Sequence, residues 1–441
     1  MKHQKGQSLV FLLGFTAALI GAMLLVFNTG QVTADKERLV NAADAAAYSG
    51  AIWEARSLNF QSYMNRAIVA NEVAIAQSVS LRSWVDYVRS SLNNVNLILR
   101  FVPYLGQVTT ALANASTQLH RGTQTFLKPA EQVISVINTA LSGAETTVHF
   151  ATVLAAKSIA EETLRANNPA NQPTRATTIA FFVTNNRAWL NFTRNFSGND
   201  RARLKDVVVR SRDGFTADRG HGLDMIVVEL QKRGGTQLFG FDTWRGVDTM
   251  SLHTPDFFFD FDESVPIGFG SAQNGPQDVN IGQVQRSDYG DSRRDNPRAT
   301  RAAIVQHNTG GRRASGYRGL PATRDISNPQ RQDDRSLDFV VEVERGRNTL
   351  ATSDRALGVE GARLYSGGNA SQRPALHNDK LYAISTAQVY FMRPVGRADG
   401  RREFPSLYNP YWQVRLAPVS RSSRLAAAID KRLVDPYVLI E

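Results

Sequence analysis

The chain has 441 residues, of which 42% are hydrophobic, so it can hold a membrane segment and one or two domains with packed cores. Its formal net charge is +11, but the basic residues are scattered and no nucleic-acid-binding signature is present, so we expect no nucleic-acid partner. The absence of cysteine excludes disulfides, thiolate metal sites and cysteine nucleophiles.

An uncharged, mostly apolar run covers residues 8–27 and follows the basic residues Lys2 and Lys5. A helix rises 1.5 Å per residue, so a run of about 20 residues matches a hydrocarbon core of about 30 Å. We therefore predict a cytoplasmic tip and transmembrane anchor within residues 1–30, in contact with the lipid bilayer through residues 8–27. The positive charge before the run predicts a cytoplasmic N-terminus, with the rest of the chain on the other side of the membrane.

The apolar run is longer than that of a typical signal peptide, and no clear Ala-x-Ala cleavage site follows it. We interpret it as an uncleaved signal anchor, with a cleaved signal peptide and a buried helix of a soluble protein as the alternatives. Gly14, Ala18 and Ala22 are spaced by four and share a helix face, which predicts close contact with another helix in the membrane. Small residues are also common in membrane spans that make no such contact.

Residues 31–200 have the pattern of a helical region. There is no proline before Pro103, and apolar residues recur at helical spacing around Ile68 and Ile75. Residues 31 to about 100 are therefore expected to form one long helix, either continuous or with breaks. Pro129 suits the first turn of a new helix. Further helices are expected at about 104–117, from Pro129 onward, at about 144–165 and at 177–196, with a turn or linker at 167–174.

Residues 201–441 are expected to form a β-rich exported region. A β-branched strand at 223–230, a glycine turn at 232–235 and a return strand at 236–241 predict a hairpin. Further strands are expected at 247–252, 256–261, 337–343, 383–392 and 411–416, and a short final helix at 422–432. The stretch 271–336 is rich in polar residues and glycine, which predicts a long polar loop. The fold class is therefore α+β, with a membrane helix that continues into a long helix and a helical half before a β-rich half.

The best candidate for a chemical site is the acidic, Phe-rich segment 256–263. In an extended strand, Asp260 and Asp262 would project from one face about 7 Å apart, and with Asp256 they could bind Ca²⁺ or act as an acid/base pair. A half-buried strand with a solvated acidic face explains the same residues. The familiar hydrolase, metalloprotease and nucleotide-binding motifs are absent, so we expect neither catalysis nor a cofactor, and a membrane-anchored periplasmic enzyme or Ca²⁺-binding protein is the alternative.

An alanine-rich segment, 39–51, follows the apolar run and contains Asn41-Ala-Ala-Asp44 followed by three alanines. Together with the basic start, Gly6-Gln7 and the apolar run, it resembles the TadE/TadG-like proteins of the tight-adherence (Tad), or Flp, pilus-assembly system. This resemblance implies a single-pass protein of the bacterial inner membrane with a periplasmic C-terminal domain. It also implies a structural role, with other pilus-assembly or envelope proteins as partners, and self-association is left open.

Two features of the first fifty residues bear on the role of the chain. Asn41 and Asp44 lie three residues apart on the emerging helix and share a face, which predicts contact with a partner or with the chain's own domain. An alanine-rich stalk of high helix propensity is the alternative.

Pilins that are cut after glycine carry Glu at the fifth mature position, and a cut after Gly6 would place Phe11 there. A processed pilin-like subunit is therefore the less favoured reading.

Overall fold

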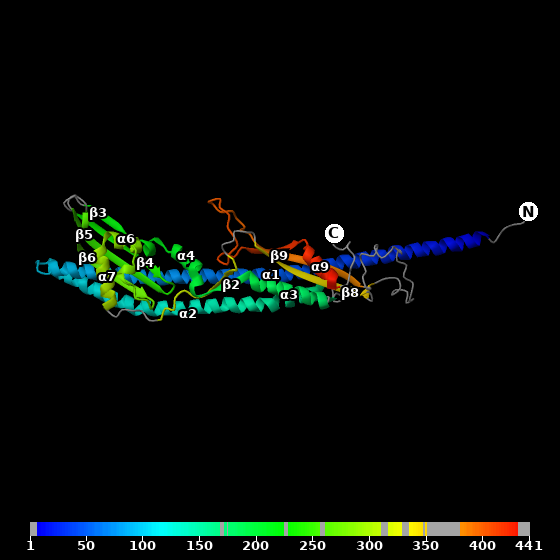
Figure 1. Ribbon diagram of the computed structural model, residues 1–441, viewed down its shortest axis with the longest axis horizontal. Helices are drawn as coiled ribbons and strands as arrows, with labels where there is room; N and C mark the ends of the chain where they lie inside the picture. The colour runs from blue at the N-terminus through cyan, green and yellow to red at the C-terminus, as the bar shows by residue number, and fades with distance from the viewer. Residues whose placement is uncertain are drawn as a thin grey trace, which may run out of the picture. The chain divides into compact units, whose positions relative to one another are not determined.

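The computed structural model shows an α+β chain with a helical first half and a sheet-rich second half, which confirms the predicted fold class (Figure 1). The described residues are 7–167, 172–173, 175–224, 228–255, 261–309, 316–328, 335–346, 349–350 and 380–430. The chain divides into two compact units, each made of separate segments. Unit 1 comprises Met1–Phe60, Thr147–Arg194 and Ile326–Glu441, and unit 2 comprises Gln61–Thr146 and Asn195–Asp325. The units thus differ from the consecutive regions that the sequence suggested.

Three helices carry most of the helical content: α1 (Gln7–Leu99), α2 (Leu105–Asn167) and α3 (Arg175–Phe192). The expected single long helix is confirmed, because α1 is continuous for 93 residues and includes the apolar run. The expectation of separate helices between residues 104 and 165 is wrong, since α2 is one helix with Pro129 inside it. Residues of α2 after Pro129, such as Glu131 and Ser135, are buried, so packing continues beyond the proline and offsets its lost hydrogen bond.

Unit 1 contains an antiparallel sheet in the order β1-β8-β9-β10. The strands are β1 (Gln172–Pro173), β8 (Ser336–Gly346), β9 (Lys380–Phe391) and β10 (Trp412–Ala417), and helix α9 (Arg421–Asp430) follows them. Alanines of α1 share a hydrophobic core with β8 and β9. The approach is close at Gly50, where an added Cβ would lie 2.6 Å from Cζ of Phe339. The small side chains therefore let α1 lie against the sheet.

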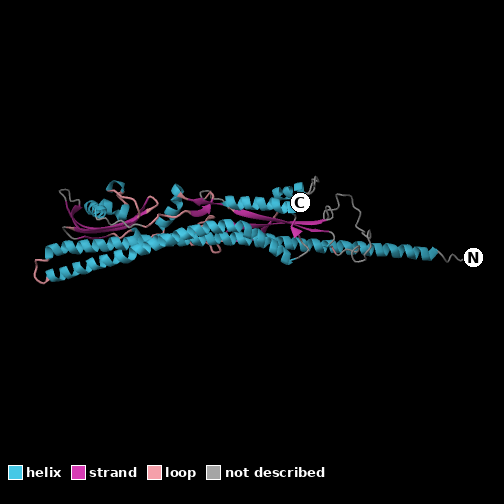
Figure 2. Ribbon diagram, turned by 90° about the horizontal axis from the view of Figure 1, so that it is seen from below, coloured by secondary structure: helices cyan, strands magenta, loops and turns pink. Residues whose placement is uncertain are grey.

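Unit 2 contains a second antiparallel sheet in the order β3-β4-β5-β6. The strands of the chain are magenta in Figure 2. Its strands are β3 (His221–Asp224), β4 (Glu229–Phe239), β5 (Thr243–Pro255) and β6 (Phe261–Asn274). The short elements are η1 (Gly198–Arg201), α4 (Ala202–Arg210), α5 (Gly214–Ala217), η2 (Ile281–Gln283), α6 (Asp288–Asp295) and α7 (Pro297–Thr309). Strands β2 (Thr193–Phe196) and β7 (Thr323–Ile326) lie where the chain passes from one unit to the other.

The predicted turn at 232–235 is wrong, because β4 continues through Gly234 and Gly235 in register with β5. A Cβ on Gly235 would lie 2.6 Å from the backbone oxygen of Ala217 and 2.8 Å from the backbone nitrogen of Gly290. This glycine therefore serves close packing inside a strand. The reversal comes later, at Gly240, whose φ is +56°.

The predicted polar loop at 271–336 is also wrong over its first part. Residues up to Asn274 belong to β6, and η2, α6 and α7 follow. A small hydrophobic cluster holds these elements together, formed by Val247, Val279, Val284, Tyr289, Ala303 and Ile304. Side-chain hydrogen bonds hold the segment together where large apolar side chains are few. Ser292, for example, forms hydrogen bonds with Thr249 at 2.7 Å and with Thr300 at 2.8 Å. The segment folds because its polar groups are paired.

Helix α1 covers the outer edge of β6, the last strand of the unit 2 sheet. Four polar side chains of α1, spaced by four residues, bond main-chain groups of alternate β6 residues. The pairs are Arg82 with Gln273 O (3.2 Å), Asp86 with Ser271 N (3.4 Å), Ser90 with Phe269 N and O (2.8 and 2.5 Å), and Asn94 with Ile267 O (2.9 Å). Four helical residues rise about 6.0 Å and two strand residues about 6.6 Å, so the two repeats stay in step over this length.

We expect Gly270→Ala to destabilise unit 2. A Cβ at this position would fall on the backbone nitrogen of Tyr87 and 2.5 Å from the backbone oxygen of Ser83, neither of which can move without displacing α1. The cost should be about 1–3 kcal/mol, seen as a lower thermal midpoint of the full-length protein in detergent. The matched control is Gly143→Ala, in a helix with nothing within 4 Å, which should raise stability by about 0.5–1 kcal/mol. An unchanged midpoint for Gly270→Ala would contradict the close approach.

Candidate membrane anchor and adjoining contact surface

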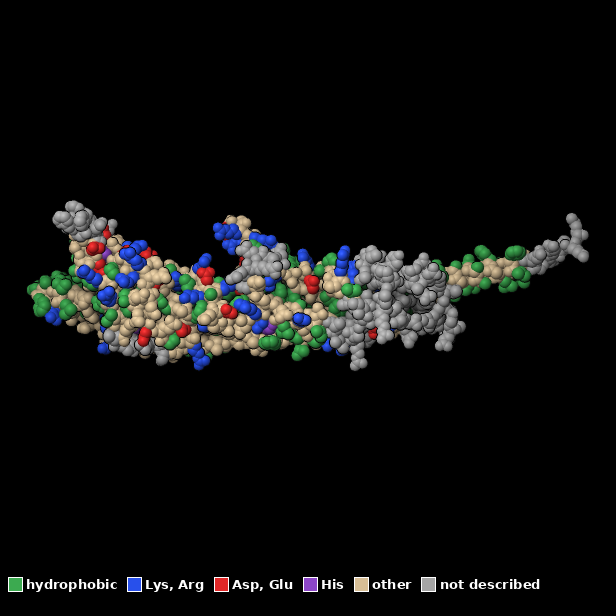
Figure 3. All heavy atoms as spheres, in the orientation of Figure 1, with side chains coloured by type: hydrophobic (Ala, Val, Ile, Leu, Met, Phe, Trp, Pro, Cys, Tyr) green, Lys and Arg blue, Asp and Glu red, His purple; other side chains and the backbone are tan. Residues whose placement is uncertain are grey.

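The first part of α1 has the surface of a membrane helix. It is long and apolar enough to cross a bilayer, and none of its most apolar window is buried by the rest of the chain. Figure 3 shows hydrophobic side chains along this stretch, and Phe11 is 80% exposed. Gly14, Ala18 and Ala22 are all exposed, and a Cβ on Gly14 would meet nothing within 4 Å. The face on which they lie is therefore open, and its contact with another membrane helix stays a prediction.

Charged side chains fasten α1 to the unit 1 sheet just after the apolar run. The carboxylate of Asp35 is buried and accepts hydrogen bonds from Arg345 of β8 at 3.1 Å and from Arg38 at 3.4 Å. Lys36 donates to the carbonyl oxygen of Tyr382 in β9, and burial lowers the pKa of this lysine. The helix thus changes within two turns from an exposed apolar surface to one held by ionic and polar contacts.

The alanine-rich segment has two different faces. Ala42, Ala43, Ala46 and Ala47 are almost fully buried and belong to the core of unit 1. Asn41 is exposed, as are Val40 and Tyr48 on its flanks, whereas Asp44 is half-buried. The alanines therefore pack in the chain's own domain, and the outward face that carries Asn41 is the candidate contact surface. Asp44 lies at the margin of that surface.

Glu54 lies on the same helix, and its carboxyl group is buried. Its Oε2 atom has no hydrogen-bond partner, and burial raises the pKa of this carboxyl well above the usual value of 4.5. Burial favours the protonated form of this carboxyl over the ionised form, because an ionised carboxylate would be desolvated without full compensation. Glu54 is therefore a polar position within the packed part of unit 1.

The acidic segment is only partly described. Asp256 and Asp260 lie outside the described residues, and Asp262 is exposed at the start of β6. Glu263, in contrast, is buried and accepts hydrogen bonds from Ser251 at 2.7 Å and from the first turn of α7, at Arg298 N and at Ala299 N (2.8 Å). This carboxylate therefore caps a helix N-terminus. In the described part of the chain, no group of three or more His, Asp or Glu side chains could hold a metal ion.

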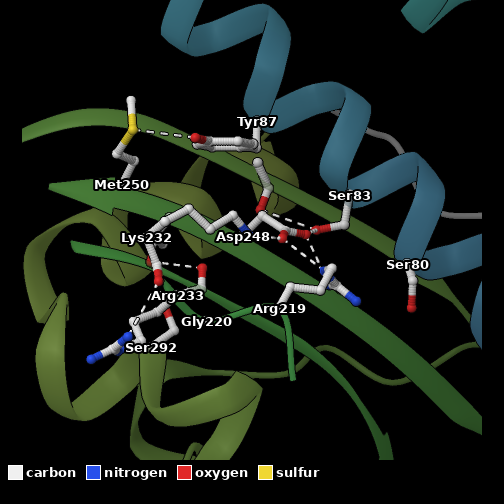
Figure 4. A network of polar contacts seen from close by, with 12 residues as sticks. Ser80, Ser83, Tyr87, Arg219, Gly220, Lys232, Arg233, Asp248, Met250 and Ser292 are labelled. Carbon is white, nitrogen blue, oxygen red and sulfur yellow. Dashed lines mark hydrogen bonds and ion pairs between the residues drawn. The ribbon is translucent and has the colours of Figure 1, made fainter. Parts of the chain in front are cut away.

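Sequence reasoning missed a buried ionic cluster in unit 2, which Figure 4 shows. Asp248 of β5 accepts two hydrogen bonds from Arg219, both at 2.8 Å, one from Lys232 of β4 at 2.5 Å and one from Ser83 of α1 at 2.7 Å. Burial alone would raise the pKa of Asp248, but the two cations lower it to about 2. The carboxylate therefore stays ionised, with both oxygens engaged, and this cluster joins α1 to the sheet.

No short-range pattern links the members of this cluster, because they come from separate elements. The available signal was the presence of Lys232 and Asp248 within otherwise strand-like segments. A charge inside a strand that is buried by a helix needs a partner, since an unpaired one would lose several kcal/mol of hydration. That argument predicts that a partner exists but does not identify it.

A comparison with known protein families finds a match that covers the N-terminal segment. Residues 6–54 match the model of the family described as "Putative Flp pilus-assembly TadE/G-like". No curated protein and no solved structure matches the chain. The matched residues include the exposed apolar helix, the charged fastening at Asp35 and the alanine face, so the resemblance seen in the sequence is confirmed. Residues 6–54 of the chain are therefore similar to the TadE/G-like Flp pilus-assembly family.

Proposed function

We propose that the chain is a single-pass structural component of a Tad/Flp-type pilus-assembly apparatus in the bacterial inner membrane. Its N-terminus lies in the cytoplasm, and its exported domain makes protein–protein contacts in the periplasm. The observation that carries this proposal is the position of the family match. It covers the residues where an exposed apolar helix becomes a helix whose alanine face belongs to the core of unit 1.

The charge distribution supports this orientation. Lys2 and Lys5 precede the apolar run, whereas Asp35, Lys36 and the two residues after them nearly cancel on the other side. The excess of positive charge on one side is the feature that sets the orientation of a membrane helix. Phe11 at the position where a pilin cut after Gly6 would need Glu supports an anchor that is retained rather than a subunit that enters the fibre.

The contacts of two buried carboxylates, Asp248 and Glu263, are structural in kind. Asp248 is held by Arg219 and Lys232, and Glu263 caps α7, so each carboxylate is engaged by groups of the chain itself. General acid/base catalysis needs a group that can exchange a proton near the working pH. Asp248, with its pKa of about 2, does not have that property.

Two surfaces of α1 are the proposed contact sites. Within the membrane, the small residues Gly14, Ala18 and Ala22 allow another helix to approach closely. Outside it, Asn41 and the adjacent margin at Asp44 face away from the alanine core. Because the alanine face is already used by unit 1, a partner that binds this part of the helix would contact the opposite face.

Membrane topology tests the proposed location. The chain has no cysteine, so single cysteines can be introduced as Gln4→Cys and as Asn199→Cys, the latter at an exposed position of η1. With a membrane-impermeant maleimide on spheroplasts, we expect Asn199→Cys to react at once and Gln4→Cys to react only after permeabilisation. The reverse pattern, or recovery of the protein in the soluble fraction, would contradict the proposal.

A charge on the candidate contact surface tests the proposed role. We expect Asn41→Arg to reduce both the co-purification of pilus-assembly proteins and piliation by roughly tenfold or more, because an unpaired charge in a protein interface costs several kcal/mol. Its thermal midpoint should change little, since Asn41 is exposed. The matched control is Asn114→Arg, at an exposed site on α2 outside the family match. Equal losses in both variants, or wild-type piliation in Asn41→Arg, would argue against this surface.

A further inference from the structure

Helix α2 carries an exposed apolar stripe along the part that belongs to unit 2. Every seventh residue from 105 to 133 is a large apolar side chain, with between 48% and 77% of its surface exposed: Leu105, Leu112, Leu119, Phe126 and Val133. A second row lies three positions after each of these and consists of Val108, Ala115, Gly122, Pro129 and Val136. We call these two rows the α2 seam. Their spacing is that of the a and d positions of a coiled coil.

The opposite face of α2 is the buried one, and most of its buried side chains are polar. The buried residues of this stretch include Ala113, Ser116, His120, Glu131, Ser135 and Asn138. Two of them bond α1, Glu131 through Arg82 at 2.8 Å and Asn138 through Glu72 at 2.8 Å.

A helix at the surface of a soluble domain normally buries its apolar stripe and exposes its polar face. The reversal in α2 marks the seam as a surface that is covered in the working assembly.

The spacing of the seam favours another helix as its partner. A straight helix drifts by about 20° per heptad from an exact seven-residue repeat, so a repeat kept over this length follows a supercoiled neighbour. Ala115 and Gly122 in the second row leave room for the large side chains of a facing helix to insert between the rows. A lipid surface would require an apolar face, but it would not require a seven-residue register.

The residues that flank the seam favour an identical partner. The positions beside the first row are uncharged: Thr109, Ala111, Ser116, Gln118, Thr123, Thr125, Ala130 and Gln132. No Asp or Glu occurs between residues 87 and 130, so the seam offers no negative charge with which to select a basic partner. Two like seams meet without repulsion, since charged flanks are what separate unlike coiled-coil partners.

We propose that the α2 seam pairs with the same seam of a second copy of this chain. The paired region from Leu105 to Val133 would be about 42 Å long and would bury on the order of 1,000 Å² over the two copies. This pairing lies outside residues 6–54 and does not rest on the proposed function. It gives the chain a self-association surface separate from the small residues of the membrane helix.

Disulfide cross-linking of the full-length protein in its membrane tests the pairing, since the chain has no cysteine of its own. We take the pair as parallel, so that each row faces the same row of the other copy. Leu119→Cys, in the middle of the first row, then meets its own equivalent. Asn114→Cys is the matched control, because this residue is also exposed but lies on another face of α2. Disulfides form only when the two Cα atoms come within about 7 Å. We expect at least tenfold more dimer from Leu119→Cys than from Asn114→Cys under mild oxidation.

A second measurement separates a true seam from copies that are merely close together. In the Leu119→Cys background, Leu112→Gln with Phe126→Gln should lower the dimer yield at least fivefold, while Asn114→Gln should leave it unchanged. Equal yields from Leu119→Cys and Asn114→Cys, or no dimer from either, would overturn the proposal. So would cross-linking of Leu119→Cys to a different protein, or quenching of a fluorophore at this site by nitroxide-labelled lipid.

Discussion

Both compact units are built on helix α1. Each unit uses this helix in its core, but the contacts differ in kind. In unit 1 the alanines of α1 pack against β8 and β9, as closely as Gly50 against the ring of Phe339, and Asp35 and Lys36 add polar contacts at one end. In unit 2 polar side chains of α1 bond the edge of β6 and the carboxylate of Asp248. Beyond its exposed apolar run, the 93-residue helix is therefore held by a mainly alanine contact in one unit and by a row of hydrogen bonds in the other.

The polar contact of α1 in unit 2 satisfies groups that would destabilise the fold if they were left without hydrogen bonds. An edge strand presents unpaired main-chain groups that invite aggregation, and the helix satisfies them with a row of side chains. Arg82 serves both this row and the ion pair with Glu131 of α2. The buried face of α2 supplies polar partners to α1, while the large apolar residues of the seam are exposed.

The sequence predicts those elements correctly whose pattern lies within one continuous segment. The apolar run, the lack of proline before Pro103 and the helical spacing that follows were enough to predict α1. The prediction fails where a residue serves a distant contact. The sequence predicts a turn at Gly235, but this glycine leaves room for the main chain near Gly290. It predicts a helix start at Pro129, but α2 continues through this residue.

For the candidate contact surface, too, the sequence predicts the local features but not the long-range contacts. The position of Asn41 on one helix face follows from spacing, but the burial of its alanine neighbours depends on β8 and β9, which lie about 300 residues later in the chain. The cluster around Asp248 joins Arg219, Lys232 and Ser83 from separate elements, so no local pattern could reveal it. The polar segment after β6 folds through side-chain hydrogen bonds, which composition does not show.

The central claim is that the alanine-rich part of α1 is a core element of unit 1 and not a free stalk between the membrane and a domain. Hydrogen exchange of the full-length protein in detergent tests this claim directly, since amides of a packed core element open only with global unfolding. We expect the amides of residues 42–58 to exchange in the slowest class, together with those of β9. Fast exchange in residues 42–58 beside a slowly exchanging β9 would contradict it.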